Sequence, residues 1–132
     1  MPKALTRHMR IHHIAIIASD YARAKDFYTR ILGFEVIRET YREERKSYKL
    51  DLRVGEAEIE LFSFPNPPPR VNNPEARGLR HLAFTVADFD ASRARLLGFG
   101  VELEEVRTDP TTGRRYFFFR DPDDLPLEIV ES

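Results

Sequence analysis

The 132-residue chain contains no cysteine. This absence excludes disulfide bonds, zinc–thiolate centres and thiol nucleophiles. Long apolar runs are also missing, and none approaches the roughly 20 residues that a membrane-spanning helix needs. The basic N-terminal stretch, residues 1–10, lacks the apolar segment of a signal peptide. From these absences we expect a cytoplasmic protein without a membrane partner.

An excess of charge of one sign is absent as well. The chain has 21 basic and 22 acidic residues, a net charge of −1, and the two signs are mixed along the sequence. A protein that binds nucleic acid usually shows a basic patch or stripe, so we expect no nucleic-acid partner. With 42% hydrophobic residues the chain is rich enough in apolar side chains to fold. Its length suits one domain.

The sequence matches itself when it is shifted by 68 residues. Residues 12–21 (HHIAIIASDY) align with residues 80–89 (RHLAFTVADF), and residues 59–62 (IELF) align with residues 127–130 (LEIV). Self-similarity at a fixed spacing indicates a duplicated structural unit. We therefore expect two repeats, at about 10–64 and 79–131, within a single domain. The proline-rich residues 65–78 would form the connector between them.

Each repeat is predicted to have the order βαβββ. Short apolar runs rich in β-branched residues indicate strands, and apolar residues at helical spacing after a capping residue indicate a helix. In the first repeat we expect a strand at 11–18, a helix from Ser19 or Asp20 to Gly33, and strands at 34–42, 47–54 and 57–64. In the second we expect a strand at 79–86, a helix from Asp88 to Gly98 or Gly100, and strands near 101–107, 114–120 and 126–131.

Two histidines and two glutamates fall on equivalent positions of the two repeats. His13 aligns with His81 and Glu60 with Glu128, and the separation is 47 residues in both repeats (60 − 13 and 128 − 81). A mid-strand carboxylate is costly to bury unless a cation or hydrogen-bond donors compensate it. Two imidazoles and two carboxylates would neutralise a divalent cation and leave coordination positions for a ligand. Donors without sulfur suit nickel, cobalt, manganese, iron or zinc.

A structural role is the alternative for each of these residues taken singly. A lone strand histidine is more often hydrogen-bonded than a ligand, and a lone strand glutamate is more often solvated or paired with an arginine. The shared spacing of all four outweighs that alternative. His8 and His12 have no partner in the other repeat, so we expect both to be structural or solvent-exposed.

The sequence resembles the vicinal oxygen chelate superfamily, which includes glyoxalase I, methylmalonyl-CoA epimerase, extradiol dioxygenases and fosfomycin and bleomycin resistance proteins. It is most similar to small bacterial glyoxalase-like proteins of unassigned substrate. The resemblance rests on residues 12–20, 27–34, 59–65, 78–86 and 119–131. It implies an α+β fold in which two βαβββ repeats form a cupped, partly closed mixed sheet with helices outside. It also implies a homodimer, and one metal ion held by His13, Glu60, His81 and Glu128, within one chain or between two.

The same resemblance narrows the chemistry. Dioxygenases and fosfomycin enzymes do not keep a glutamate at the position of Glu60, whereas compact bacterial glyoxalase I keeps all four ligands. Glyoxalase I usually carries an arginine where this chain has Ile17, which argues against glutathione as the co-substrate. The family's DPDG turn is DPDD here, so Asp124 is predicted to adopt the left-handed conformation that glycine accepts.

These observations predict a glyoxalase I-like lyase or isomerase that depends on a divalent metal and acts on a small carbonyl compound through a metal-chelated ene-diolate. The resemblance implies that Glu128 is the base that takes the substrate proton. Arg42, Lys49, Arg115 and Tyr116 are candidates for orienting the substrate. Two alternatives are a binding or resistance module that sequesters a small toxic compound, and an extradiol dioxygenase, which needs only three protein ligands.

Overall fold

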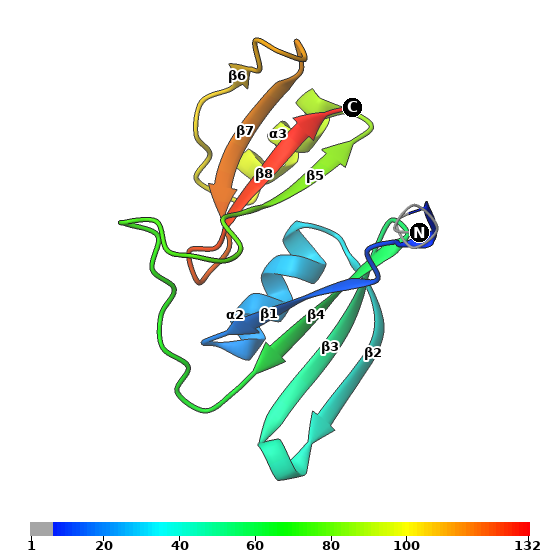
Figure 1. Ribbon diagram of the computed structural model, residues 1–132, viewed down its shortest axis with the longest axis vertical. Coiled ribbons are helices and arrows are strands. Elements are labelled where there is room, and N and C mark those ends of the chain that lie inside the picture. The colour runs from blue at the N-terminus through cyan, green and yellow to red at the C-terminus, as the bar shows by residue number, and fades with distance from the viewer. Residues whose placement is uncertain (1–6) are drawn as a thin grey trace. The chain divides into compact units, whose positions relative to one another are not determined.

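The computed structural model describes residues 7–132 (Figure 1). Its contacts divide the chain into two compact units, Met1–Pro67 and Pro68–Ser132. The division falls inside the predicted connector, so each unit holds one predicted repeat. That the two repeats make one domain stays a prediction, and each unit is described by itself.

The first unit contains a four-stranded mixed sheet with strand order β1-β4-β3-β2. Strand β1 runs parallel to β4, and the other neighbours are antiparallel. Its elements are β1 (His13–Ala18), α2 (Tyr21–Asp26), η1 (Phe27–Ile31), β2 (Glu35–Arg42), η2 (Glu43–Arg45), β3 (Ser47–Val54) and β4 (Ala57–Ser63). The βαβββ order and all four strands are as predicted, within one or two residues at each end.

The predicted first helix is built from two segments. Its N-cap is Asp20, whose side chain accepts a hydrogen bond from the Arg23 amide at 3.1 Å. A carboxylate at this place satisfies one of the amides that have no partner within the helix. After Asp26 the chain continues as the π-helical turn η1, and Gly33, with φ of 80°, follows its end. The apolar stripe predicted for this helix is confirmed at three buried residues, Ala24, Phe27 and Tyr28.

The second unit repeats this plan with strand order β5-β8-β7-β6, and β5 runs parallel to β8. Asp88 caps its helix as predicted, accepting a hydrogen bond from the Ala91 amide at 2.9 Å. Asp124 adopts the predicted left-handed conformation, with φ of 65°. The elements are β5 (Leu82–Val86), α3 (Phe89–Gly98), β6 (Arg107–Thr108), β7 (Arg115–Arg120) and β8 (Pro126–Glu131).

The strand predicted near 101–107 is wrong for most of its length, since β6 covers Arg107–Thr108 alone. The Val101 amide donates to the Leu96 carbonyl as part of the helix end, so a strand has no free backbone donor there. Farther along, the Glu104 amide donates a hydrogen bond to the Phe118 carbonyl at 2.9 Å. This single bond is not continued into a ladder of backbone hydrogen bonds with β7. The apolar residues of this segment therefore suggested a longer strand than its backbone hydrogen bonds support.

One face of each sheet packs against its helix and forms the core of its unit (Figure 1). Burial of an aliphatic or aromatic side chain of this size stabilises a fold by about 1.5–3 kcal/mol. The buried apolar strand residues are Ile16, Ala18, Leu50, Leu52, Ile59 and Leu61 in the first unit and Phe117, Phe119, Leu127 and Ile129 in the second. Because side chains alternate along a strand, Glu60 and Glu128 point to the opposite face of each sheet.

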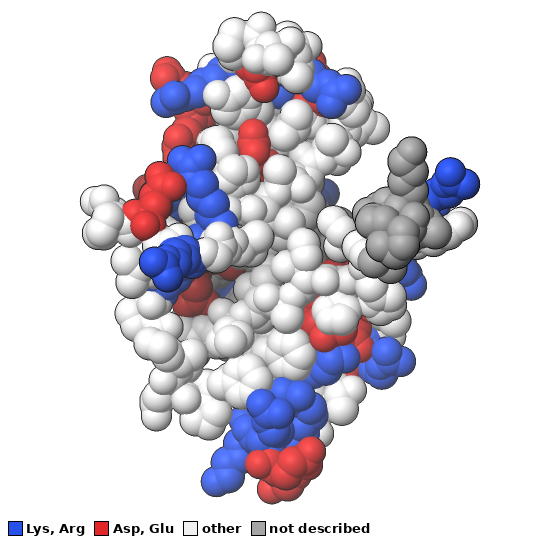
Figure 2. Space-filling model, viewed as in Figure 1, with Lys and Arg blue, Asp and Glu red and all other residues white. Residues whose placement is uncertain are grey.

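The fold class is therefore α+β, with two four-stranded mixed sheets that are open rather than closed into barrels. Among residues 7–132 no helix is long and apolar enough to cross a membrane. Figure 2 shows Lys and Arg side chains among Asp and Glu side chains on the face in view. This agrees with the mixed charge of the sequence.

Candidate metal centre

The first unit brings two of the predicted ligands together. The imidazole Nε2 of His13 lies 3.5 Å from Oε2 of Glu60. His13 begins β1, and Glu60 lies on the adjacent β4 beside Ala15. The Glu60 side chain is 14% exposed and that of His13 is 41% exposed. This leaves the carboxylate mostly buried while one edge of the imidazole faces solvent.

His12 contacts the other ring nitrogen of His13. The Nδ1 atoms of the two imidazoles are 2.9 Å apart, and the rings meet edge to face. A hydrogen bond between two neutral imidazoles needs one Nδ1 to donate and the other to accept. Histidine ligands in metal sites usually make such a bond through the nitrogen that does not bind the metal, which fixes the ring. His12 is exposed, as expected, but it also supports His13.

A buried carboxylate that the sequence did not single out lies next to Glu60. Asp51 is 1% exposed and pairs with Glu60 in the register of β3 and β4. Lys49 Nζ donates to Asp51 Oδ1 at 2.8 Å and lies 3.7 Å from Glu60 Oε2, and Arg38 Nε donates to Asp51 Oδ2 at 3.1 Å. Lys49 thus links the buried aspartate to the candidate ligand.

The second unit brings the other two predicted ligands together. Nε2 of His81 lies 3.1 Å from Oε1 of Glu128, and the Glu128 side chain is again 14% exposed. Glu128 pairs with Ala83 on β5, just as Glu60 pairs with Ala15 on β1, so both glutamates have the same register. Phe118 stands opposite Glu128 on β7, and its ring meets the His81 ring edge to face at 5.0 Å.

The four residues proposed to orient a substrate have different surroundings. Lys49 contacts Glu60, as described above. Tyr116 lies on the same strand face as Phe118 and packs edge to face against its ring. Arg42 places its guanidinium 4.8 Å from the Phe62 ring centre, on the same strand face as Glu60.

Arg115, the last of the four, lies on the helix side of its sheet instead. It makes ion pairs with Asp90 and Glu131 and covers the ring of Phe89. These hydrogen bonds raise the pKa of the Arg115 guanidinium and lower the pKa of the Glu131 carboxyl. Its surroundings therefore indicate a structural role for Arg115.

The predicted ligands thus meet as two pairs, one in each unit. Across residues 7–132, three or more histidine, aspartate or glutamate side chains do not gather into one metal-binding group. That the two pairs serve a single ion stays a prediction. Sequence reasoning missed Asp51 and the supporting contact of His12. The signal for Asp51 was the alternation of charged Lys49, Asp51 and Arg53 with apolar residues along one strand.

Known proteins share this chain's sequence and fold over nearly their whole length. The uncharacterised protein YwkD of Bacillus subtilis strain 168 is 62% identical over 92% of this chain and 96% of its own. The uncharacterised protein YaeR of Escherichia coli strain K12 is 57% identical over 93% of this chain and 96% of its own length. The crystal structure of SMU.1112c superposes with a TM-score of 0.90 at 49% identity, covering 94% of this chain and 99% of that one.

More distant relatives carry the names of enzymes. A 2-epi-5-epi-valiolone epimerase of an Actinomyces species is 28% identical over 91% of this chain and 78% of its own. A lactoylglutathione lyase of Pseudomonas aeruginosa is 26% identical over 99% of this chain and 87% of its own length. Residues 10–129 match the model of the glyoxalase/bleomycin resistance protein/dioxygenase superfamily. The chain belongs to this superfamily.

Proposed function

We propose that the protein is a glyoxalase I-like isomerase or lyase that uses one divalent metal ion and acts on a small carbonyl compound. In this proposal His13, Glu60, His81 and Glu128 hold the ion, either within one chain or between the two chains of a homodimer. The observation that carries the proposal is the repeated pairing of a histidine Nε2 with a mostly buried glutamate, at the same strand register in both units.

The distances within each pair suit two ligands of a common ion. Metal–nitrogen and metal–oxygen bonds of about 2.1 Å place neighbouring ligand atoms about 3.0 Å apart in octahedral and about 3.4 Å apart in tetrahedral geometry. The observed separations are 3.5 Å in the first unit and 3.1 Å in the second. Mixed nitrogen and oxygen donors suit nickel, cobalt, zinc, manganese or iron.

The surroundings of Glu128 are a second reason to propose a cation site. Its carboxylate is mostly buried, and among residues 7–132 its one ion-pair partner is the imidazole of His81. A mostly buried carboxylate is costly unless a cation or hydrogen-bond donors compensate it, and a divalent ion would supply that compensation. The residues present therefore fit a divalent cation.

The chemistry follows from this arrangement. A divalent ion held by these residues would supply Lewis-acid polarisation of a carbonyl oxygen. Glu128, which would leave the ion to act as the base, removes the proton from the carbon next to the carbonyl, and the electron pair of that C–H bond moves toward the carbonyl group. On an α-hydroxycarbonyl substrate, return of the proton to the former carbonyl carbon isomerises the molecule, because the hydroxyl loses its proton to become the new carbonyl and the old carbonyl oxygen gains a proton. Return of the proton to the opposite face of the same carbon epimerises the substrate. Both outcomes are consistent with the lyase and epimerase names of the distant relatives.

The side chains around the two pairs have supporting roles in this proposal. His12 fixes the ring of His13 through its Nδ1 contact. The Phe118 ring beside His81 shields one side of the second pair from water. Exclusion of water strengthens electrostatic interactions at a reacting centre.

The test is Glu128→Gln, with Glu105→Gln as the matched control, because the Glu105 side chain is 80% exposed and its ion pair is with Arg107 rather than with a candidate ligand. We expect the wild-type protein and the control to exchange a substrate proton with solvent in a screen of α-ketoaldehydes with and without thiols. Glu128→Gln should lower that exchange by about 100-fold or more. Full exchange together with full metal content in Glu128→Gln would show that Glu128 is not the base.

A further inference from the structure

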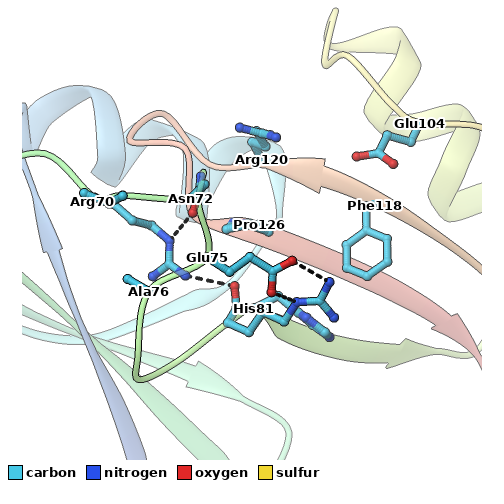
Figure 3. Close-up of a pocket in the computed structure, with 11 residues that line it drawn as sticks. Arg70, Asn72, Glu75, Ala76, His81, Glu104, Phe118, Arg120 and Pro126 are labelled. Carbon is cyan, nitrogen blue, oxygen red and sulfur yellow. Dashed lines mark hydrogen bonds and ion pairs between the residues drawn. The ribbon is translucent and has the colours of Figure 1, made fainter.

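The second unit has a pocket of about 270 Å³ beside the His81–Glu128 pair. All its lining residues belong to this unit, so its shape does not depend on the first one. Arg70, Asn72 and Ala76 of the connector border it in Figure 3, as do Phe118 and Arg120 of β7 and Pro126 of β8. The volume lies just below the usual range for drug-sized ligands, so it suits a small metabolite.

Hydrogen bonds hold the connector in place as a wall of the pocket. Arg70 Nε donates to Asn72 Oδ1 at 2.6 Å, and its Nη2 donates to the carbonyls of Leu79 at 2.6 Å and Arg80 at 2.9 Å. The Asn72 amide nitrogen donates to the carbonyl of Asp124 at 2.7 Å, which ties the connector to the turn before β8. A segment without helix or strand is thereby fixed against the sheet.

The charges around the pocket leave a positive excess. Arg80 is neutralised by Glu75 at 2.8 Å, whereas the hydrogen bonds of Arg70 go to uncharged oxygens. The side chain of Arg120 makes neither a hydrogen bond nor an ion pair with any residue from 7 to 132. Glu104 is the one further carboxylate among the lining residues. Two cations, Arg70 and Arg120, therefore face a single free anion.

The pocket continues the strand face that carries the second pair. Phe118 lies opposite Glu128 and Arg120 lies opposite Pro126, so the two side chains are successive on one face of β7. Two residues of strand advance by about 6.6–6.8 Å. Because His81 and Phe118 both line the pocket, a ligand that starts at the His81–Glu128 pair passes the Phe118 ring before it reaches Arg120.

We propose that this pocket binds the anionic end of the substrate, a carboxylate or phosphate on a short chain attached to the carbonyl group, with Arg120 as its counter-charge. A guanidinium binds either group through two parallel hydrogen bonds. The proposal rests on the proposed function for the position of the carbonyl group. The anion site itself rests on the pocket of the second unit.

The test measures binding to the full chain after treatment with a metal chelator, so that its result is independent of metal content and turnover. The carboxylate probe is 4-oxopentanoate, compared with its uncharged methyl ester. The phosphate probe is dihydroxyacetone phosphate, compared with dihydroxyacetone. We expect at least one anion to bind about five- to tenfold more tightly than its uncharged counterpart, and the better anion identifies the natural group. This preference should weaken in high salt, which screens exposed charges.

Arg120→Gln should remove most of the preference and leave the part that Arg70 supplies, Arg120→Lys should reduce it less, and Arg114→Gln should leave it unchanged. Arg114 is a suitable control because it is exposed, lies in the turn before β7 and does not line the pocket. Equal affinity for both charged and uncharged probes, or an undiminished preference in Arg120→Gln, would overturn the proposal. Loss of activity in Glu128→Gln tests the proposed function alone, so the two ideas can fail separately.

Discussion

Asp51 and Phe118 occupy the same position in the two units, each directly across from that unit's candidate ligand glutamate. Asp51 pairs with Glu60 between β3 and β4, and Phe118 pairs with Glu128 between β7 and β8. The first unit thus places a buried, ion-paired carboxylate beside its glutamate, and the second places an aromatic ring there. The two units therefore share one strand register but differ in the side chain opposite the glutamate.

The ion pairing of Asp51 in the first unit depends on Lys49. Lys49→Met would leave the fully buried Asp51 with Arg38 as its one remaining cation, and the Arg38 side chain is 64% exposed. We expect the free energy of unfolding to fall by about 2 kcal/mol, the usual size of a lost hydrogen bond to a charged group. Urea unfolding measures this change. Lys46→Met, in the turn before β3, is the control and should change stability by less than about 0.5 kcal/mol. Equal stability of both variants would mean that Lys49 does not sustain Asp51.

His12 is predicted to orient His13 for metal binding. Its loss in His12→Ala frees the His13 ring to rotate, because the contact between the two Nδ1 atoms disappears. Removal of a hydrogen-bond partner behind a metal ligand typically lowers metal affinity by about 10- to 100-fold. Competition with a metal-binding dye measures the affinity, and His8→Ala, another exposed N-terminal histidine, is the control. Similar affinity in the two variants would exclude this role for His12.

A prediction on acid stability concerns Glu39, on the surface of the first unit. Hydrogen bonds from Tyr21 and Lys25 lower the pKa of the Glu39 carboxyl, and burial and the same bond raise the pKa of Tyr21. A carboxyl whose pKa is lower in the folded state stabilises that state above its unfolded pKa. This contribution disappears as the pH falls through the folded pKa.

Glu39→Gln should therefore be less stable than the wild type at neutral pH, and the difference should shrink in acid. Urea unfolding at neutral pH and near pH 3 gives the comparison. Glu35→Gln, at the start of the same strand, provides the control because Glu35 forms no ion pair with any described residue. A difference that is constant across the pH range would contradict the prediction.

The repeat made most of the fold predictable. Equal spacing of His13–Glu60 and His81–Glu128 required equal strand registers, and the structure has them. Asp51 could not be found by the same comparison, because its structural equivalent in the second unit is Phe118, so the repeat holds no second carboxylate at this position.

Features that depend on which groups pair in hydrogen bonds could not be predicted from the sequence. The segment before β6 has strand-like apolar residues, but its first amide, that of Val101, is taken by the helix end. The connector was predicted to be irregular, and it has neither helix nor strand, yet Arg70 and Asn72 fix it beside the second pair. The role of Arg120 follows from its lack of a partner, a property that no sequence pattern encodes.

The central claim is that the two pairs share one ion. The most direct test is the number of divalent metal ions per chain in the purified protein, measured by elemental analysis of the wild type, His13→Ala and His81→Ala. We predict one ion per chain in the wild type and its nearly complete loss in either variant, because each pair alone supplies too few ligands. Two ions per chain, with one kept in each variant, or a wild-type protein that binds none when metal is supplied, would contradict the account.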